Sequence, residues 1–377
     1  MTSKRLIAVH LLNDWSGSPL VFRQALEALH QAGYVVTLFT ATSEGGGFLS
    51  NIDGVTTRSL RYKWHPAKLV TLVNYLLVQL SLFGKLMVLL RSTDTVYINT
   101  LLPFGAALAG WVRGCRVVYH VHEVSIKPRP LKIWLRAVAN QTASEALFVS
   151  RYTAEQTQLK QPKNRLIYNS LPDLFMERAS EIHTPNMFSP FTVLMVCSNK
   201  AYKGTYEFVE AARQLPSLQF RLVMNTNQAD VDAFVEQYEP PQNCTVFPAQ
   251  TDTIPFYQQA HVVVNLSHRN AWVETFGLTI LEGMACGRPV LVPPVGGVRE
   301  LIDDGEEGFV VDALAPQAVV SVLQRLSSDI SLYMRVAKAA RHRADSFSGY
   351  AFRQQIVEVF SGKADRATPV VEPFVTR

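Results

Sequence analysis

Short apolar runs alternate with amphipathic stretches along the first half of the chain. Residues 5–12 read R-L-I-A-V-H-L-L and residues 34–40 read Y-V-V-T-L-F-T, and both runs have the length and β-branched content of buried strands. Between them, residues 21–32 carry a helical pattern that stops at Gly33. This order predicts a β-α-β unit of a parallel sheet.

The same alternation returns after a Pro-containing polar segment. Residues 191–198 read F-T-V-L-M-V-C-S, a strand pattern, and residues 205–215 read as a helix. A chain of 377 residues that is 48% hydrophobic and 18% charged has room for two cores. We therefore expect an α/β fold with an N-terminal domain over residues 1–172 and a C-terminal domain over residues 191–345, joined by a linker over residues 173–190. A terminal helix over residues 346–361 and a disordered tail over residues 362–377 follow.

The most informative stretch runs from Glu274 to Asp312. Glycine at 277 stands where a loop becomes a short apolar helix, which we expect to start near Phe276 and to end at Gly287. The unpaired N–H groups at such a helix start, with the positive end of the helix dipole behind them, form a site for a diphosphate. These groups belong to Gly277, Leu278 and Thr279.

Two carboxylates and a second glycine turn accompany this helix start. Glu274 precedes the turn and Glu282 lies about one turn into the helix, so both can accept hydrogen bonds from the hydroxyls of one elongated ligand. The strand V-L-V-P-P follows, and then Gly296 and Gly297 open another loop at the carboxyl edge of the sheet, where open α/β folds bind ligands. The alternative is an ordinary β-α-β unit with solvated glutamates.

The stretch from Glu274 to Asp312 resembles the C-terminal signature of the retaining glycosyltransferases of family 4. A weaker similarity extends along about the first 350 residues. The resemblance implies the GT-B fold, with two facing Rossmann-like domains, parallel sheets and a cleft between them. It implies that the N-terminal domain binds an acceptor and the C-terminal domain binds a nucleoside diphosphate sugar, UDP- or GDP-linked, with no further cofactor and no metal.

The resemblance also implies roles for individual residues. Glu274 holds hydroxyls of the donor sugar, and Glu282 holds the ribose. Lys203, in the lysine-glycine pair with Gly204, binds the leaving diphosphate together with the helix that opens at Phe276, Gly277, Leu278 and Thr279. We also expect Trp272 either to shape the sugar pocket or to be a buried aromatic residue.

Two positions depart from the family pattern. Gly17 is followed by Ser18 where the family carries a second glycine near the diphosphate, and an ordinary helix start capped by Ser16 or Ser18 is the alternative. The family has an arginine where this chain has Ser198. We expect Lys200 or Asn199 to replace that cation, or catalysis to be weaker.

The string V-V-Y-H-V-H-E ends a predicted strand and places two histidines on one face. His120 and His122 suggest a metal pair by spacing, but only Glu123 is near in sequence as a third ligand, so we expect no metal. The resemblance implies that His122 hydrogen-bonds the donor sugar as a neutral imidazole. His120 is expected to be a core or cleft-wall histidine.

Basic residues are concentrated in the first half of the chain. Residues 1–180 carry 20 Lys and Arg against 10 Asp and Glu. This distribution predicts attraction to an anionic membrane surface or to a phosphate-bearing acceptor. No nucleic-acid reader motif accompanies the basic residues, so a nucleic-acid partner is not expected. They form two clusters, the first at Arg58, Arg61, Lys63 and Lys68 and the second at Lys127, Arg129, Lys132 and Arg136.

Residues 66–90 are apolar enough to raise the question of a membrane span. Lys68, Asn74 and Lys85 would have to cross the bilayer core, so a span is rejected. The favoured interpretation is a helix buried against the sheet. The alternative is a partly exposed amphipathic helix that rests on a bilayer beside the basic clusters.

The remaining features bear on the compartment and on the acceptor. The four cysteines are scattered, without a C-x-x-C pair, and the N-terminus enters a strand without a signal-peptide pattern. We expect a cytoplasmic protein, peripheral on the inner face of the membrane, that glycosylates a lipid-linked saccharide in bacterial lipopolysaccharide or other surface polysaccharide synthesis. The alternatives are a GT-B-like epimerase or hydrolase of sugar nucleotides, or a nucleotide-binding subunit with weak catalysis.

Overall fold

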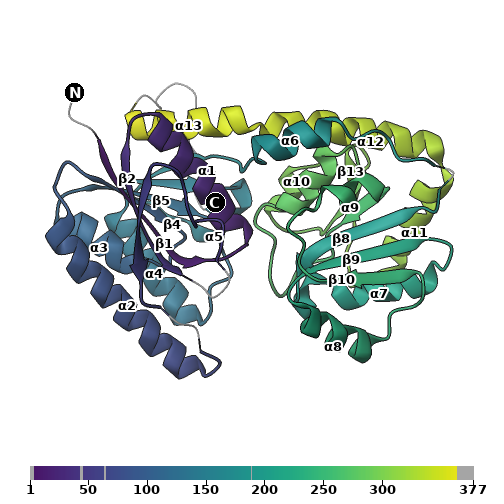
Figure 1. Cartoon of the computed structure of the whole chain (residues 1–377), viewed down its shortest axis with the longest axis horizontal. Helices are drawn as coiled ribbons and strands as arrows, with labels where there is room; N and C mark the ends of the chain where they lie inside the picture. The colour runs from purple at the N-terminus through teal and green to yellow at the C-terminus, as the bar shows by residue number, and fades with distance from the viewer. Residues whose placement is uncertain (1–3, 43–45, 63–64, 188, 363–377) are drawn as a thin grey trace, which may run out of the picture. The chain divides into compact units, whose positions relative to one another are not determined.

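The computed structural model describes residues 4–42, 46–62, 65–187 and 189–362. The chain divides into two compact units: unit 1 is Met1–Asn169 with Tyr350–Arg377, and unit 2 is Ser170–Gly349. Each unit contains one all-parallel sheet with helices on both faces (Figure 1). The expected tail lies outside the described residues, apart from Gly362.

The sheet of unit 1 has the strand order β3-β2-β1-β4-β5-β6-β7. The order reverses between β1 and β4, which is the position where doubly wound sheets bind ligands. The strands are β1 (Arg5–Asn13), β2 (Val35–Thr42), β3 (Val55–Leu60), β4 (Thr95–Asn99), β5 (Arg116–Val121), β6 (Glu145–Phe148) and β7 (Lys163–Leu166).

Alternation along β4 distributes its side chains between the two faces of this sheet. Val96 and Ile98 belong to the core cluster that includes buried residues of α2, α3 and α4, whereas Tyr97 packs on the other face against Phe22 of α1 and Phe360 of α13. The last helix of the chain therefore completes the core of unit 1. The helices of this unit are α1 (Gly17–Gln31), α2 (Lys68–Leu89), α3 (Phe104–Val112), α4 (Arg129–Thr142), α5 (Arg151–Thr157) and α13 (Gly349–Ser361).

The sheet of unit 2 has the order β10-β9-β8-β11-β12-β13, and it reverses between β8 and β11. Its edge strand β13 is short, and Gly308 there faces the carbonyl oxygen of Val290, where a Cβ would lie only 2.3 Å away. The strands are β8 (Thr192–Ser198), β9 (Gln219–Asn225), β10 (Cys244–Phe247), β11 (Val262–Val264), β12 (Val290–Val292) and β13 (Gly308–Val310).

The helices of unit 2 cover both faces of its sheet. On one face, buried residues of α7, α8, α11 and α12 form a single core cluster with the strands. On the other face α10 approaches β11 so closely that a Cβ at Gly283 would lie 2.8 Å from Val263 Cγ2. The helices are α6 (Asp173–Ser180), η1 (Ala201–Lys203), α7 (Thr205–Gln214), α8 (Gln228–Tyr238), α9 (Ile254–Gln259), α10 (Leu278–Ala285), η2 (Gly297–Glu300), α11 (Pro316–Ser328), α12 (Ile330–Ala344) and η3 (Asp345–Phe347).

The expected linker contains a helix that is fixed to unit 2. Arg178 of α6 forms a two-pronged ion pair with Asp252, with nitrogen–oxygen distances of 2.7 and 3.0 Å. Arg341 of α12 donates hydrogen bonds to the carbonyl oxygens of Ala179 and Ile182 at the end of α6. Residues 173–180 are therefore a structured part of unit 2, because Asp252 and Arg341 from later in the chain bind this helix.

The interpretation of residues 66–90 as a buried helix is wrong for most of the helix. α2 buries Tyr75, Val78, Gln79, Leu82 and Leu86 and leaves its opposite side exposed. The sequence did not reveal this because leucine and valine occupy all sides of the helix. Of the described residues, α2 forms the one helix that is long and apolar enough to cross a membrane by length and composition, and 28% of its most apolar window is buried.

A fully buried arginine joins three segments of unit 2. Arg288 is 0% exposed and donates hydrogen bonds to the carbonyl oxygens of Tyr257, Gln258 and His183 at 3.0 to 3.1 Å. It thereby provides donors for carbonyl groups at the C-terminal end of α9, where, among the described residues, the Tyr257 carbonyl otherwise accepts only a 3.3 Å hydrogen bond from Ala260 N. Burial lowers the pKa of Arg288, although a guanidinium remains charged at neutral pH.

We expect Arg288→Met to lower the free energy of unfolding by about 3 kcal/mol, because buried carbonyl groups lose their donors. The measurement is the urea midpoint of the transition that unit 2 undergoes. Arg335→Met is the control, since Arg335 is 52% exposed in its ion pair with Glu306, and it should change stability by less than about 0.5 kcal/mol. Equal midpoints for the two variants would contradict this role of Arg288.

Candidate functional site

An ion pair between Lys203 and Glu274 lies at the centre of the candidate site in unit 2. Lys203 Nζ is 2.8 Å from Glu274 Oε2, and the side chains are 16% and 21% exposed. Asn265 Nδ2 lies 3.4 Å from the same oxygen and donates to it. Burial alone would raise the pKa of Glu274, but Lys203 and Asn265 outweigh burial and hold that pKa below its usual value.

The same balance applies to the lysine. Burial alone would lower the pKa of Lys203, but Glu274 outweighs burial and raises it. Both groups are therefore charged at neutral pH, and a cation is already fixed in place before a ligand binds.

The two loops that carry this pair follow adjacent strands at the point where the strand order reverses. Lys203 ends η1, after β8, and Asn265 directly follows β11. Gly204 has φ +82°, and a Cβ there would lie 2.2 Å from the carbonyl oxygen of Leu266. Only glycine allows the loops to approach this closely, so the lysine-glycine pair sets the position of the lysine.

The predicted helix start is present, two residues later than expected. α10 begins at Leu278, and Gly277 precedes it with φ +93°, where a Cβ would lie 2.6 Å from Val298 Cγ2. The N–H groups of Leu278 and Thr279 have no backbone acceptor within the described part of the chain. They are therefore free to bind an anion at the positive end of the helix dipole.

The residues around the start of α10 differ in how exposed their side chains are. Leu278 and Thr279 are partly exposed. The side chain of Phe276 is 2% exposed and packs against Phe347 with ring centroids 5.8 Å apart. The Phe276 ring lies in the core, so only the backbone of Phe276 remains available for the predicted contact with the donor.

The second glycine turn contacts the backbone of Glu274. Gly297 N donates to the Glu274 carbonyl oxygen at 2.9 Å, and Gly296 has φ +117° with a Cβ position 2.3 Å from that oxygen. The two predicted loops therefore meet at one residue. Only glycine at 296 permits this contact, which fixes the backbone that carries the carboxylate.

Glu282 lies on α10 and faces a buried tyrosine. Tyr257, which is 0% exposed on α9, donates a hydrogen bond of 2.5 Å to Glu282 Oε2. Burial raises the pKa of Glu282 to about 7, and the tyrosine hydrogen bond opposes this rise. Near neutral pH this carboxyl group therefore exists in both protonation states, unlike Glu274.

The positions around the missing family arginine lie apart from the ion pair. Ser198 is partly exposed at the end of β8, and Lys200 is exposed just before η1. Within the described residues, no hydrogen bond or ion pair joins either side chain to Lys203 or Glu274. The replacement of the arginine by Lys200 therefore stays a prediction.

Three residues at this site, Asn265, Tyr257 and Tyr202, were not predicted from the sequence, and a fourth, Trp272, was given two interpretations. Asn265 and Tyr257 each support one of the two glutamates, but they lie in other segments and belong to no local motif. Trp272 is 38% exposed and stacks on Tyr202, next to Lys203, with ring centroids 5.8 Å apart and an angle of 20°. The interpretation of Trp272 as a buried aromatic is therefore wrong.

In unit 1, the two histidines of the H-x-H string lie side by side at the end of β5. Their ring centroids are 4.3 Å apart, and His120 Nδ1 is 2.8 Å from the Tyr97 hydroxyl. Burial lowers the pKa of His120 to about 3 and lowers that of His122 well below its usual range. Both imidazoles are therefore neutral at physiological pH, which is the state expected for His122.

The turn at Gly17 reaches the same edge of the sheet. Gly17 is the first residue of α1, and Asn99 at the end of β4 donates to the Ser18 carbonyl oxygen at 3.2 Å and contacts His10 Nδ1 at 3.1 Å. Ser16 precedes the helix, but its hydroxyl bonds to Asp14 and caps no helix N–H group. The alternative of a helix capped by the Ser16 side chain is therefore wrong.

The described residues contain no cluster of three or more His, Cys, Asp and Glu that is suited to a metal ion. Glu123, the nearest carboxylate in sequence to His122, accepts a hydrogen bond from Leu101 N at 2.9 Å. Burial raises the pKa of Glu123 to about 7. The Glu123 carboxyl group is therefore already hydrogen-bonded to the backbone of the loop after β4.

Comparison with known proteins identifies both units. The family described as Glycosyl transferases group 1 matches residues 183–343, and the Glycosyl transferase 4-like domain matches residues 16–170. A D-inositol 3-phosphate glycosyltransferase of Thermomonospora curvata is 36% identical over 29% of this chain and 25% of its own length. The corresponding protein of Paenarthrobacter aurescens is 26% identical over 56% of this chain and 53% of its own length. The matched part thus spans between a quarter and about half of these curated relatives.

Solved structures give the fold. The Anabaena protein Alr3699/HepE, in complex with UDP and glucose, aligns with a TM-score of 0.75 at 18% identity, over 94% of this chain and 99% of that one. The sucrose-phosphate synthase of Thermosynechococcus elongatus aligns with a TM-score of 0.74 at 20% identity, over 95% and 98%. The two family matches show that the chain belongs to the family 4 type of glycosyltransferases, and these alignments together with the two parallel sheets show the GT-B fold.

Proposed function

We propose that this glycosyltransferase moves a sugar from a nucleoside diphosphate sugar to an acceptor hydroxyl with retention at the anomeric carbon and without a metal. The observation that carries the proposal is the Lys203–Glu274 pair beside the start of α10. A fixed cation and free helix N–H groups supply the positive charge that a departing diphosphate needs. In this proposal they replace the divalent metal that other transferases use.

The donor is bound through unit 2 in this proposal. The diphosphate lies at Lys203 and the N–H groups of Gly277, Leu278 and Thr279, while Glu274 accepts from sugar hydroxyls and Glu282 from the ribose. Solved Anabaena structures of the same fold contain UDP or UDP-glucose, which supports a UDP-hexose as the first donor to test. His122 and the Gly17 turn of unit 1 are proposed to contact the sugar and the diphosphate.

In the reaction, the bond between the anomeric carbon and the phosphate oxygen breaks while the acceptor oxygen bonds to the same face of that carbon. The proton of the acceptor hydroxyl passes to the departing phosphate oxygen. Glu274 is engaged by Lys203 and Asn265, which supports a positioning role for it rather than one as covalent nucleophile. The retained configuration is testable from the anomeric proton coupling of the product.

The proposed acceptor is a lipid-linked saccharide on the inner face of the cell membrane, reached from the cytoplasm. The exposed apolar side of α2 and the basic first half of the chain support this choice. A phosphorylated soluble acceptor is the second candidate, favoured by the names of the inositol phosphate and sucrose-phosphate relatives. Product analysis with each acceptor class separates them.

The donor class is tested first by thermal shift with UDP, GDP, ADP and TDP. We expect one nucleotide to raise the melting temperature in proportion to its affinity and concentration, and we expect Glu282→Ala to remove that rise. A shift that persists in Glu282→Ala would refute the ribose contact. No shift with any nucleotide would favour the alternative of a degenerate subunit.

Loss of the lysine charge should reduce turnover more than donor binding. We expect Lys203→Met to lower kcat by about 100- to 1000-fold, because stabilisation of the leaving diphosphate is lost in the transition state. Lys338→Met on α12 is the matched control and should retain full activity. Lys200→Met tests whether this exposed lysine replaces the family arginine. If it does, the kcat of the Lys200→Met variant also falls. A change below threefold in Lys203→Met would contradict the proposed role.

Donor affinity should rise with pH through about 7. The raised pKa of Glu282 means that the carboxyl group is protonated at lower pH and accepts poorly from the ribose, so the Kd of a UDP-hexose should fall about tenfold from pH 5.5 to 8.5. A UDP-hexose is used because its diphosphate is a diester that does not titrate in this range. Glu282→Gln should abolish the slope. A slope that Glu282→Gln retains would point to another group, such as Glu123.

A further inference from the structure

The exposed side of α2 is unusual for a helix of a Rossmann-like sheet. Its buried side packs on α3, where Gln79 accepts a hydrogen bond from Gly105 N at 2.9 Å. The opposite side, which we term the α2 face, exposes large apolar side chains at helical spacing, with Leu80 at 68% and Val88 at 89%. The α2 face consists of Leu69, Val70, Leu72, Val73, Leu76, Leu77, Leu80 and Val88.

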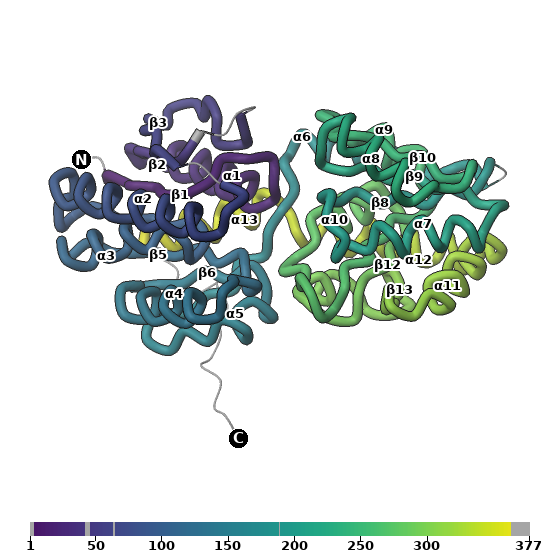
Figure 2. Tube along the Cα trace, turned by 90° about the horizontal axis from the view of Figure 1, so that it is seen from below, coloured from purple at the N-terminus to yellow at the C-terminus, as the bar shows by residue number. Residues whose placement is uncertain are grey.

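Aromatic contacts connect this helix to exposed residues of α4. Tyr75 of α2 packs edge-on against Phe104 of α3 at 5.8 Å, and Phe104 packs against Trp134 of α4 at 5.9 Å. Trp134 is 48% exposed, and its neighbour Ile133 is 57% exposed. In both views α2 and α3 lie next to each other on one side of the sheet (Figures 1 and 2). Ile133 and Trp134 therefore add exposed apolar side chains on a helix that packs near α3.

The sequence segments that contain and flank α2 are basic. Residues 54–93 include six lysines and arginines, of which Lys63 lies outside the residues that the structure describes, and the buried Asp94, which pairs with Arg5, is the next acidic residue. Residues 124–143, which contain α4, add four basic residues and again no acidic residue. On an interfacial helix, the combination of an apolar face with basic residues in the neighbouring segments is complementary to an anionic bilayer.

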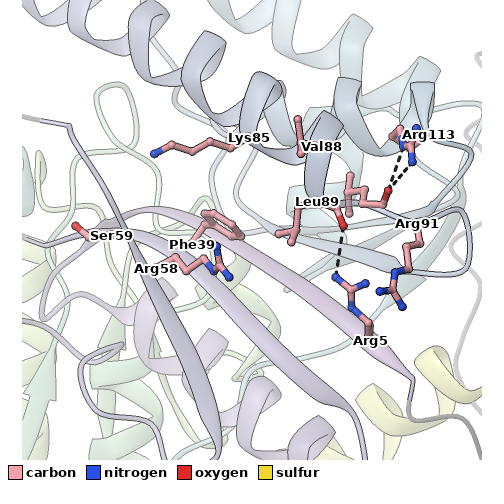
Figure 3. A pocket seen from close by; sticks show the side chains of 10 residues that line it. Arg5, Phe39, Arg58, Ser59, Lys85, Val88, Leu89, Arg91 and Arg113 are labelled. Carbon is pink, nitrogen blue, oxygen red and sulfur yellow. Dashed lines mark hydrogen bonds between the residues drawn. The ribbon is translucent and has the colours of Figure 1, made fainter.

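A basic pocket continues the α2 face at the C-terminal end of the helix (Figure 3). Its volume is about 1120 Å³, and Val88 lines it together with Phe39 of β2. Arg113 donates to the carbonyl oxygen of Leu90 at 2.8 and 3.1 Å, and Arg5 forms a 3.6 Å ion pair with Asp94. The cations that line the pocket are Arg5, Arg58, Lys85, Arg91 and Arg113.

Three of these cations are available to an external anion. Within the described residues, no ion pair with an acidic side chain involves Arg58, Lys85 or Arg91. They come from β3, α2 and the loop after α2, and all three line the pocket, with their charged ends spread along it (Figure 3). Several cations around an open space are suited to a phosphate monoester or diester.

We propose that unit 1 docks on an anionic lipid bilayer through the α2 face, and that the basic pocket receives the phosphate of a lipid headgroup. This inference rests on the proposed function, in which the acceptor is a lipid-linked saccharide, and it adds the surface through which the protein contacts the membrane. The helix lies in the interface rather than across it, because its other side is packed on α3. Symmetric pairing of two copies through this face would bring the same basic segments together, which disfavours a dimer as the occupant.

The test is co-sedimentation of the full chain with phosphatidylcholine vesicles that contain or lack phosphatidylglycerol. We expect binding to the anionic vesicles that weakens with salt, and much weaker binding to neutral ones. Leu69→Gln, Leu77→Gln and Leu80→Gln together should weaken it more than tenfold. Arg58→Gln, Lys85→Gln and Arg91→Gln together should weaken binding to anionic vesicles roughly 100-fold, at about fivefold for each cation. The control pairs Leu174→Gln with Leu314→Gln, exposed positions of unit 2 that should have no effect.

Each other outcome overturns the docking proposal in a distinct way. Binding of wild type to neither vesicle refutes it, and so does equal loss in the control. Tight binding of free glycerol phosphate without vesicle binding would make the pocket a site for soluble anions. A dimer by sedimentation that the leucine variant dissociates, without vesicle binding, would assign the face to a second copy. The nucleotide thermal shift, measured on each variant, keeps a failure of docking separate from a failure of the proposed donor site.

Discussion

The partly buried ion pair of Lys203 and Glu274 is the interaction on which the rest of the site in unit 2 depends. Each charge offsets the cost of burying the other, so both persist at neutral pH. The surrounding backbone holds both residues in position. Gly204 allows the loop that carries Lys203 to pack against the loop after β11, while Gly297 N donates a hydrogen bond to the Glu274 carbonyl oxygen and Gly296 packs closely against it. The lysine is thereby held in one position beside the carboxylate.

The parallel topology explains why these loops meet. β8 and β11 are neighbouring strands at the point where the strand order reverses, so the loops that follow them lie side by side at the carboxyl edge of the sheet, where doubly wound folds bind ligands. Unit 1 repeats this arrangement with β1 and β4, where the Gly17 turn and Asn99 lie. Each sheet therefore has one edge position where its strand order reverses, and the two positions differ in the side chains that the loops carry. The lysine and glutamates occur in unit 2, whereas neutral buried histidines occur in unit 1.

The sequence predicted much of this because the informative features were local. Alternating patterns indicated the parallel sheets, and Gly277, Lys203 with Gly204 and the two glutamates stood in recognisable strings. Features set by tertiary packing were not accessible: Tyr257 supports Glu282 from another helix, and Arg178 and Arg341 turn an expected linker into part of unit 2. The burial of α2 was predicted wrongly for the same reason, since an apolar residue does not reveal whether a neighbour covers it.

The return of α13 to the first core has a consequence for the order of synthesis. Phe360 packs on Tyr97, and Arg116 bonds to the carbonyl oxygens of Val359 and Phe360, so unit 1 is built from both ends of the chain. Unit 2 is continuous and lies between them in sequence. A ribosome therefore releases all of unit 2 before unit 1 has its last helix. The sheet of unit 1, whose strands are translated first, therefore stays partly uncovered until α13 has been translated.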